Sequence, residues 1–182
     1  MTERTPSTQA TGVDVSSHLS RQFRDLFDAE FSFVCRALQR LGVRSGDVAD
    51  VAQELFLTVH RALPAYDTAR PVRPWLCGFS VRFAANYRRL GRMAERSGEA
   101  LEHQSTPPPS DIEARDIVLK ILERLDFDRR AVVVMHDMEG FAAHEIAEAL
   151  GVPVNTVYSR LRTAREELKA AARQLEEGRS LS

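Results

Sequence analysis

The sequence has few cysteines and no long hydrophobic run, and both absences narrow what the protein can be. Two cysteines in 182 residues cannot form a disulfide framework, and they lack the spacing of metal ligands. Cys35 and Cys77 lie in apolar helical stretches and are predicted to be buried small hydrophobic side chains. No apolar run approaches the roughly 20 residues that a membrane span requires. Residues 1–17 lack the apolar segment of a secretory signal, so a cytoplasmic protein without membrane insertion is expected.

The patterns on which most enzymes depend are also missing. The sequence has no glycine-rich phosphate loop, no paired metal ligands and no spacing typical of a nucleophile with its base. The five histidines are scattered, and His136 beside Asp137 is explained most simply as the end of a helix. We therefore predict that the protein is not an enzyme, with no catalytic residues, no metal and no cofactor.

The chain has no large excess of charge of either sign. Its formal net charge is −1, whereas domains that bind DNA strongly by themselves are usually basic. The charge is nevertheless uneven, because residues 1–97 hold 14 basic and 10 acidic side chains while residues 98–182 hold 11 and 16. Local charge is therefore more informative than the total.

The hydrophobic spacing predicts an all-α fold, with two small helical bundles joined by a flexible linker. From Leu19 onward apolar residues recur at intervals of three, four and seven, as on one face of a helix. Gly42 and Pro64 are expected to end the first two helices, and Pro74 lies in the first turn of the third. The run 131–135 (AVVVM) would suit a strand, but a lone strand has no partner, so a buried helix is predicted.

Composition divides the chain into five parts. Three consecutive prolines exclude helix within residues 97–110 and favour an extended spacer. We expect a disordered tail at 1–17, a first bundle at 18–96, the linker at 97–110, a second bundle at 111–174 and a tail at 175–182.

The most specific signal is a helix-turn-helix in residues 143–162 (AHEIAEALGVPVNTVYSRLR). Ala147 is small where two helices must approach closely, and Gly151 suits the positive φ of the tight turn. An ordinary αα-hairpin with a glycine turn is the alternative. On the second helix the polar face, opposite Val157 and Leu161, carries Asn155, Ser159 and Arg162, the residue types that read base edges in the major groove.

The third predicted helix has a basic face and an aromatic start. Arg82, Arg89, Arg92 and Arg96 project within about 80° of one another at 100° per residue, which favours a polyanionic partner. Trp75 is either a core residue or a stacking platform for the bases of single-stranded DNA, and the sequence leaves both open. In the second helix Asp50, Gln53 and Glu54 point away from the buried stripe, as a solvent face or as a docking face for a basic protein.

These features together resemble the extracytoplasmic-function (ECF) group of bacterial sigma-70 family RNA polymerase sigma factors. Residues 47–63 (DVADVAQELFLTVHRAL) resemble the segment of region 2 that docks on the clamp of core RNA polymerase. The run 73–76 (RPWL) and the arginine-rich helix after it resemble the part that melts and reads the minus-10 promoter element. Residues 125–140 and the helix-turn-helix resemble region 4, which reads the minus-35 element.

The resemblance implies three sets of site residues. Polymerase contacts are expected at Asp50, Gln53 and Glu54. The melted minus-10 strand is expected at Trp75, Arg82, Asn86, Arg89, Arg92 and Arg96. The minus-35 duplex is expected at Asn155, Thr156, Tyr158, Ser159, Arg160, Arg162 and Arg165. The implied partners are core RNA polymerase, promoter DNA and an anti-sigma factor, since such a factor typically holds members of this family inactive.

Four positions depart from the family pattern. They are Ala49 for a frequent acid, Arg82 for a frequent Asn, Asp126 for a common Pro and Thr163 for a frequent basic residue. The alternative function is a helix-turn-helix regulator that binds DNA without being a polymerase subunit. Dimerisation and binding to a palindromic site without polymerase would favour it, but it does not explain the basic third helix.

Overall fold

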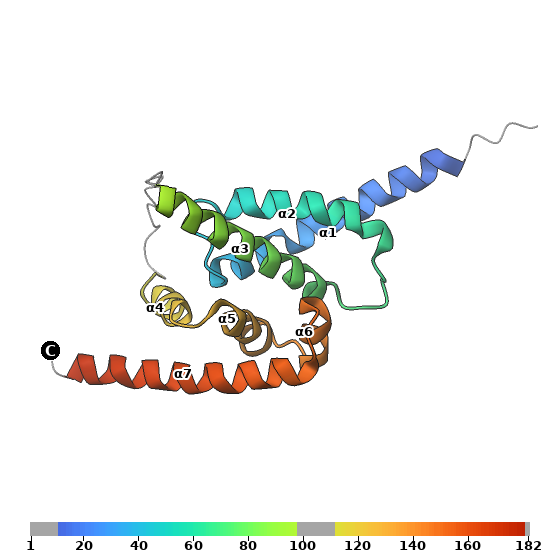
Figure 1. Cartoon of the computed structure of the whole chain (residues 1–182). Helices are drawn as coiled ribbons and strands as arrows, with labels where there is room; N and C mark the ends of the chain where they lie inside the picture. Colours follow the sequence, from blue (N-terminus) through green and yellow to red (C-terminus); the bar gives the residue numbers. More distant parts are fainter. Residues whose placement is uncertain (1–10, 98–111, 181–182) are drawn as a thin grey trace, which may run out of the picture.

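The computed structural model describes residues 11–97 and 112–180, and every regular element in these ranges is helical (Figure 1). The first unit consists of α1 (Thr11–Arg40), α2 (Val48–Ala62) and α3 (Val72–Ser97). The second unit consists of α4 (Ile112–Glu123), α5 (Phe127–Val133), α6 (Ala143–Leu150) and α7 (Val154–Ser180). A 3₁₀ turn (Leu63–Ala65) follows α2, and a π-helical turn (Val134–Met138) extends α5. The all-α prediction is confirmed.

The first unit is a three-helix bundle in which each helix packs against the other two. Helix α2 buries the stripe expected from its spacing, with Val48, Leu55 and Val59 inside. Phe56 lies between the rings of Phe27 and Phe31 on α1, with centroid separations of 4.9 and 6.0 Å. Packing of these aromatic side chains contributes to the hydrophobic contact between α1 and α2.

Helix α1 ends at the predicted glycine. Gly42 has φ of 99°, and the amide of Val43 donates to the carbonyl of Leu38 over 3.0 Å. This is the Schellman arrangement, in which a residue of positive φ closes the last helical turn. Pro74 lies in the first turn of α3, as expected. Cys77 is fully buried and burial raises its pKa to about 12, whereas Cys35 is half-buried.

The valine run at 131–135 is helical and completely buried. It forms the end of α5 and the start of the π-helical turn, and it packs against α7. The sequence could not decide between strand and helix here because both faces of the segment are covered, which removes any periodicity.

The residues expected to form the two tails are helical where the structure describes them. Residues 11–17 are helical as the start of α1, and residues 175–180 are helical as the end of α7. Once a helix is established, each further residue adds one hydrogen bond at little cost, so it can run beyond its buried face. The predicted linker lies outside the described residues from position 98 onward, as do residues 1–10, 111 and 181–182. Within the described ranges no helix is long and apolar enough to cross a membrane.

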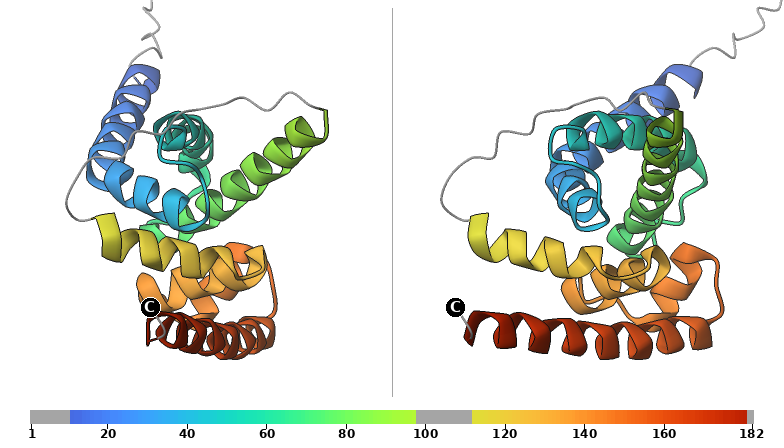
Figure 2. Two further views of the ribbon diagram at one scale, coloured as in Figure 1. Left: turned by 90° about the vertical axis from the view of Figure 1, so that its left-hand side faces the viewer. Right: turned by 60° about the vertical axis from the view of Figure 1, so that its left-hand side comes forward.

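The two units pack directly against each other (Figure 2). Helix α6 lies on α3, α4 contacts α1, and buried residues of both units form one continuous hydrophobic core. Phe33 of α1 and Phe141, just before α6, face each other with ring centroids 6.4 Å apart. The sequence predicted two bundles but gave no sign that they share a core.

A buried arginine lies between the units. Arg130 of α5 is 1% exposed, and its Nε donates to the carbonyl of Arg40 at the end of α1. Burial, together with the nearby Arg88, lowers its pKa to about 10, so the side chain remains cationic at neutral pH. Its two terminal nitrogens have no hydrogen-bond partner in the described part of the chain. A buried cation with two terminal nitrogens that lack hydrogen bonds opposes the packing that buries it.

The capping residue of α5 provides a test of the fold. The carboxylate of Asp126 accepts a hydrogen bond from the amide of Asp128 over 3.0 Å. We expect Asp126→Ala to lower the free energy of unfolding by about 0.5–2 kcal/mol, because a helix amide loses its acceptor. Urea denaturation followed by circular dichroism measures the change. Asp126→Asn is the matched control and should retain most of the stability; equal losses in both variants would contradict a capping role.

Candidate nucleic-acid interface

The helix-turn-helix comprises α6, a turn at Gly151 and the first turns of α7. Gly151 has φ of 67°, and the amide of Val152 donates to the carbonyl of Ala147 over 3.0 Å. Ile146 and Val157 are fully buried between the two helices. The turn at Gly151 therefore has the structural role that the sequence predicted.

The predicted recognition face of α7 is open to solvent. Asn155, Tyr158, Ser159 and Arg162 are exposed, Thr156 is half-buried, and the opposite side of the helix is buried at Val157, Leu161 and Ala164. Tyr158 is 58% exposed, which is unusual for a large aromatic side chain without a partner. The N-terminal turns of α7 thus present polar and aromatic groups on one face.

The three arginines of this face are not equivalent. Arg160 forms an ion pair with Asp128, whereas Arg165 binds Asp137, with its Nε 3.1 Å from Oδ2. Arg162 forms no hydrogen bond or ion pair with the described residues. Arg160 and Arg165 are therefore oriented by carboxylates of their own unit, and Arg162 is free to meet a ligand.

The Arg165–Asp137 pair includes His136. The hydrogen bond from Arg165 is the main cause of the lowered pKa of Asp137, and the same contact raises the pKa of Arg165. His136 Nδ1 lies 2.9 Å from Asp137 Oδ1. A cleft of about 320 Å³ beside this cluster is lined by His136, Tyr158, Leu161, Arg162, Arg165, Glu166 and Lys169. The recognition face is thus a shallow cationic surface.

The basic face of α3 is exposed along its length. Arg82, Asn86, Arg89, Arg92 and Arg96 are all solvent-exposed. Arg82 lies over the ring of Phe79 at 4.5 Å, and Arg89 donates to the amide oxygen of Asn86 over 2.9 Å. Their shared exposure agrees with the prediction that these residues lie on one face of the helix. Arg88, a further arginine of α3, instead faces the second unit and lies over Phe127 at 5.3 Å.

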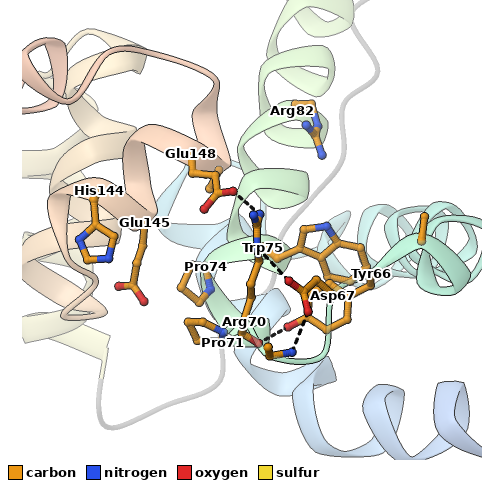
Figure 3. A pocket seen from close by; sticks show the side chains of 13 residues that line it. Tyr66, Asp67, Arg70, Pro71, Pro74, Trp75, Arg82, His144, Glu145 and Glu148 are labelled. Atoms are coloured by element: carbon orange, nitrogen blue, oxygen red, sulfur yellow. Dashed lines mark hydrogen bonds and ion pairs between the residues drawn. The ribbon is translucent and has the colours of Figure 1, made fainter.

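Trp75 lies at the edge of a cleft of about 650 Å³ (Figure 3). Its ring is half-buried and packs on Tyr66 at 4.4 Å and on Phe79 at 5.0 Å. Pro71, Pro74 and Arg82 line the same side of the cleft. Trp75 therefore lies at the margin of the core and also borders an open cavity, and its stacking on DNA bases stays a prediction.

The loop between α2 and α3 also lines this cleft, a role that the residue pattern did not indicate. The Tyr66 hydroxyl donates to the carbonyl of Arg70, and Asp67 accepts from the amide of Ala69 over 3.0 Å. These bonds fix the loop that carries Arg70 to the cleft. The far side of the cleft belongs to α6, with His144, Glu145 and Glu148, and Arg70 forms an ion pair with Glu148. No sequence pattern indicated this meeting of distant segments.

The acidic face of α2 is also exposed. Asp50, Gln53 and Glu54 point to solvent, opposite the buried stripe of the helix. Neither carboxylate forms an ion pair with the described residues. The three predicted residues therefore form an exposed surface of α2 without ion pairs to the described residues. This surface lies on a different helix from the arginines.

Comparison with known families supports the two-part division of the chain. Residues 26–92 match the family described as sigma-70 region 2, and residues 115–168 match sigma-70, region 4. The first match covers the second half of α1, all of α2 and most of α3. The second begins within the first turn of α4 and ends in the middle of α7.

Individual relatives of the chain are also sigma factors. The chain is 36% identical to the ECF RNA polymerase sigma-E factor of Escherichia coli K12, over 69% of this chain and 74% of that protein. It is 26% identical to the RNA polymerase sigma factor NccH of Alcaligenes xylosoxydans xylosoxydans, over 75% of this chain and 79% of the relative.

Two solved structures share the fold. CnrH, solved in complex with the cytosolic domain of CnrY, has a TM-score of 0.66 at 26% identity, covering 85% of this chain and 90% of that one. Sigma factor RpoE of Bartonella quintana, solved with the anti-sigma factor NepR, has a TM-score of 0.70 at 18% identity, covering 84% and 98%. The chain therefore belongs to the ECF group of the sigma-70 family and is an RNA polymerase sigma factor rather than an independent helix-turn-helix regulator.

Proposed function

We propose that three separate surfaces of this sigma factor divide the work of promoter recognition. The recognition face of α7 reads the minus-35 duplex, the arginine face of α3 with the Trp75 cleft holds the minus-10 strand, and the acidic face of α2 docks on the clamp of core RNA polymerase. The observation that carries this proposal is the exposure of all three surfaces on different helices, each opposite a buried stripe.

The chemistry of α7 suits duplex DNA. Arginine can bind guanine through two hydrogen bonds and asparagine can bind adenine in the same way, so Arg162 and Asn155 are the proposed base readers. Arg160 and Arg165 carry their own carboxylate partners, and such oriented arginines suit backbone phosphates. Phosphate contacts set the position of the helix without specifying sequence.

The chemistry of α3 suits a single strand. A row of exposed cations follows the sugar-phosphate backbone, and aromatic rings stack on unpaired bases. Trp75 and Tyr66 supply the rings beside the cleft, and Arg82, Arg89, Arg92 and Arg96 supply the cations. Arg82 replaces the asparagine frequent in the family, so the base preference of this site is expected to differ from that of its relatives.

We also propose the setting in which the factor works. Bond formation belongs to the polymerase, so this chain contributes recognition and melting but no catalysis, metal or cofactor. An anti-sigma factor is a further proposed partner, because the related CnrH and RpoE were each solved with a second protein, NepR being named as an anti-sigma factor. A factor that serves the polymerase works in the cytoplasm.

The direct test is run-off transcription with purified core polymerase freed of sigma factors. Adding the chain to a pool of genomic promoter fragments should produce specific transcripts, and their aligned start sites should reveal the two promoter elements. Binding of the chain alone to a palindromic fragment, with no transcript, would contradict the proposal.

We expect Arg162→Ala to weaken promoter binding by holoenzyme roughly 5- to 150-fold and to relax preference at one minus-35 position, because a base contact contributes about 1–3 kcal/mol. Binding to a set of promoters substituted at each minus-35 position measures both effects. Arg173→Ala, an exposed arginine later on α7, is the matched control and should change neither. Equal weakening on every sequence would reassign Arg162 to a phosphate contact.

We expect Asp50→Ala combined with Glu54→Ala to slow association with core polymerase roughly three- to tenfold, because complementary charges mainly speed encounter. Surface plasmon resonance at two salt concentrations measures the rate, and the difference should shrink at high salt. Asp25→Ala with Asp28→Ala removes two exposed acids of α1 instead and serves as the control. Identical association rates for both double variants would exclude the α2 face as a contact with core polymerase.

A further inference from the structure

The first turns of α7 expose apolar groups as well as polar ones. Val154 and Tyr158 are 38% and 58% exposed, and they lie one helical turn apart on the same side of the helix. One exposed apolar side chain is ordinary, but two neighbouring ones at the start of a recognition helix form an apolar strip that suits a ligand. Val157 and Leu161 supply the buried face of the same turns, so the packing of α7 does not depend on the Tyr158 ring.

The Tyr158 ring has no partner in the described part of the chain. None of the hydrogen bonds and ring contacts between described residues includes it. Helix α7 lies on the side of the second unit that is turned away from the first unit, so the first unit does not cover this ring (Figure 1). An aromatic ring contributes a large contact area with few rotatable bonds to fix. Tyr158 is therefore available to a molecule that α7 binds.

The major groove of DNA offers one strongly apolar group. Guanine presents two acceptors there, adenine an acceptor and a donor, cytosine a donor, and thymine an acceptor beside its 5-methyl group. Polar side chains match the donors and acceptors, whereas an apolar side chain gains free energy by covering the methyl group. The proposed base readers Arg162 and Asn155 suit guanine and adenine and leave thymine without a reader.

We infer that Tyr158 makes the minus-35 surface selective for thymine, with its ring packed against the thymine 5-methyl group. Tyr158 then joins Arg162 and Asn155 as a base reader, in a role that rests on the proposed function of α7. The ring, rather than the phenolic hydroxyl, makes the contact.

The place of Tyr158 on α7 also limits where the thymine lies. Tyr158 precedes Arg162 by one turn, about 6 Å along the helix axis at 1.5 Å per residue. Both side chains line the same shallow cleft, so they project toward the same part of the groove. Successive base pairs are about 3.4 Å apart. The thymine is therefore expected within about two base pairs of the base that Arg162 reads.

The test uses holoenzyme, assembled from the full chain and core polymerase, and a promoter recovered by run-off transcription. Each thymine of the minus-35 element, on either strand, is replaced singly by deoxyuridine. Deoxyuridine forms the same base pair and keeps the O4 acceptor, and it lacks only the 5-methyl group. Competition binding gives the methyl ratio, defined as the affinity for the thymine promoter divided by the affinity for its deoxyuridine counterpart.

Three variants identify the side chain responsible. Tyr158→Ser removes the ring, and because serine and tyrosine have similar helix propensities, α7 should remain folded. Tyr158→Phe keeps the ring and removes only the hydroxyl. Val118→Ser removes an apolar side chain that is 42% exposed on α4, and it is the matched control. Circular dichroism verifies the helix content of each variant.

We expect the wild type to show a methyl ratio of about four at one thymine, the effect of burying one methyl-sized group. This thymine should lie within about two base pairs of the position at which Arg162→Ala relaxes preference. Tyr158→Ser should lower the ratio to about one at that position. Tyr158→Phe and Val118→Ser should both retain a ratio of about four.

Three results would overturn the thymine contact. The first is a methyl ratio of about one at every thymine in the wild type, a measurement that needs no variant. The second is an unchanged ratio in Tyr158→Ser, because another side chain would then cover the methyl group. The third is loss of the ratio in Tyr158→Phe, because the hydroxyl would then be responsible.

Failure of the proposed function gives a different pattern. Transcripts that share no minus-35 element, or binding that ignores every base substitution in it, would contradict the reading of DNA by α7 and with it the role of Tyr158. Holoenzyme that discriminates among bases in the minus-35 element, with every methyl ratio at about one, would contradict the thymine contact alone.

Discussion

The close approach of α3 and α6 is the constraint on which the arrangement of the two units depends. The backbone of α6 reaches α3 at Gly78, where no side chain intervenes, and this proximity aligns the α6 carboxylates with the loop that carries Arg70. The same approach brings Phe33 against Phe141 and Arg130 against the end of α1. Interiors are close-packed, so a change of one methyl group at this point cannot be absorbed locally.

Ion pairs within the chain explain how a protein of nearly zero net charge has cationic surfaces. The net charge near zero does not reflect a lack of cationic surface, because the arginines of α3 and α7 remain exposed on one face each. Several acids are instead paired within the chain, as Asp128 is with Arg160 and Asp137 with Arg165. A sigma factor acts within the polymerase complex, so each proposed DNA surface gains effective concentration from the other contacts.

Much of the local structure could be predicted from the sequence. Helix α6 begins at residue 143, where the predicted helix-turn-helix begins. Gly42 and Gly151 have the positive φ that their turns require, and the predicted recognition face of α7 is exposed. These features depend on residues close together in the chain. Asp126, a departure from the family's proline, proved to cap α5 through its carboxylate. Helices α1 and α7 extend into the expected tails because helix propagation continues beyond the apolar pattern on which the boundaries were based.

The sequence by itself determined the helices, the helix-turn-helix, the separation of basic and acidic faces and the family. All of these are encoded in periodicity and short-range spacing. The tertiary structure alone decided that the two bundles share one core, that Arg88 and Arg130 face the other unit, and that Glu148 meets Arg70 across a cleft. Such contacts join residues far apart in the chain, as Arg70 and Glu148 are, 78 positions apart. Their formation depends on the shapes of two complete surfaces, which no local pattern specifies.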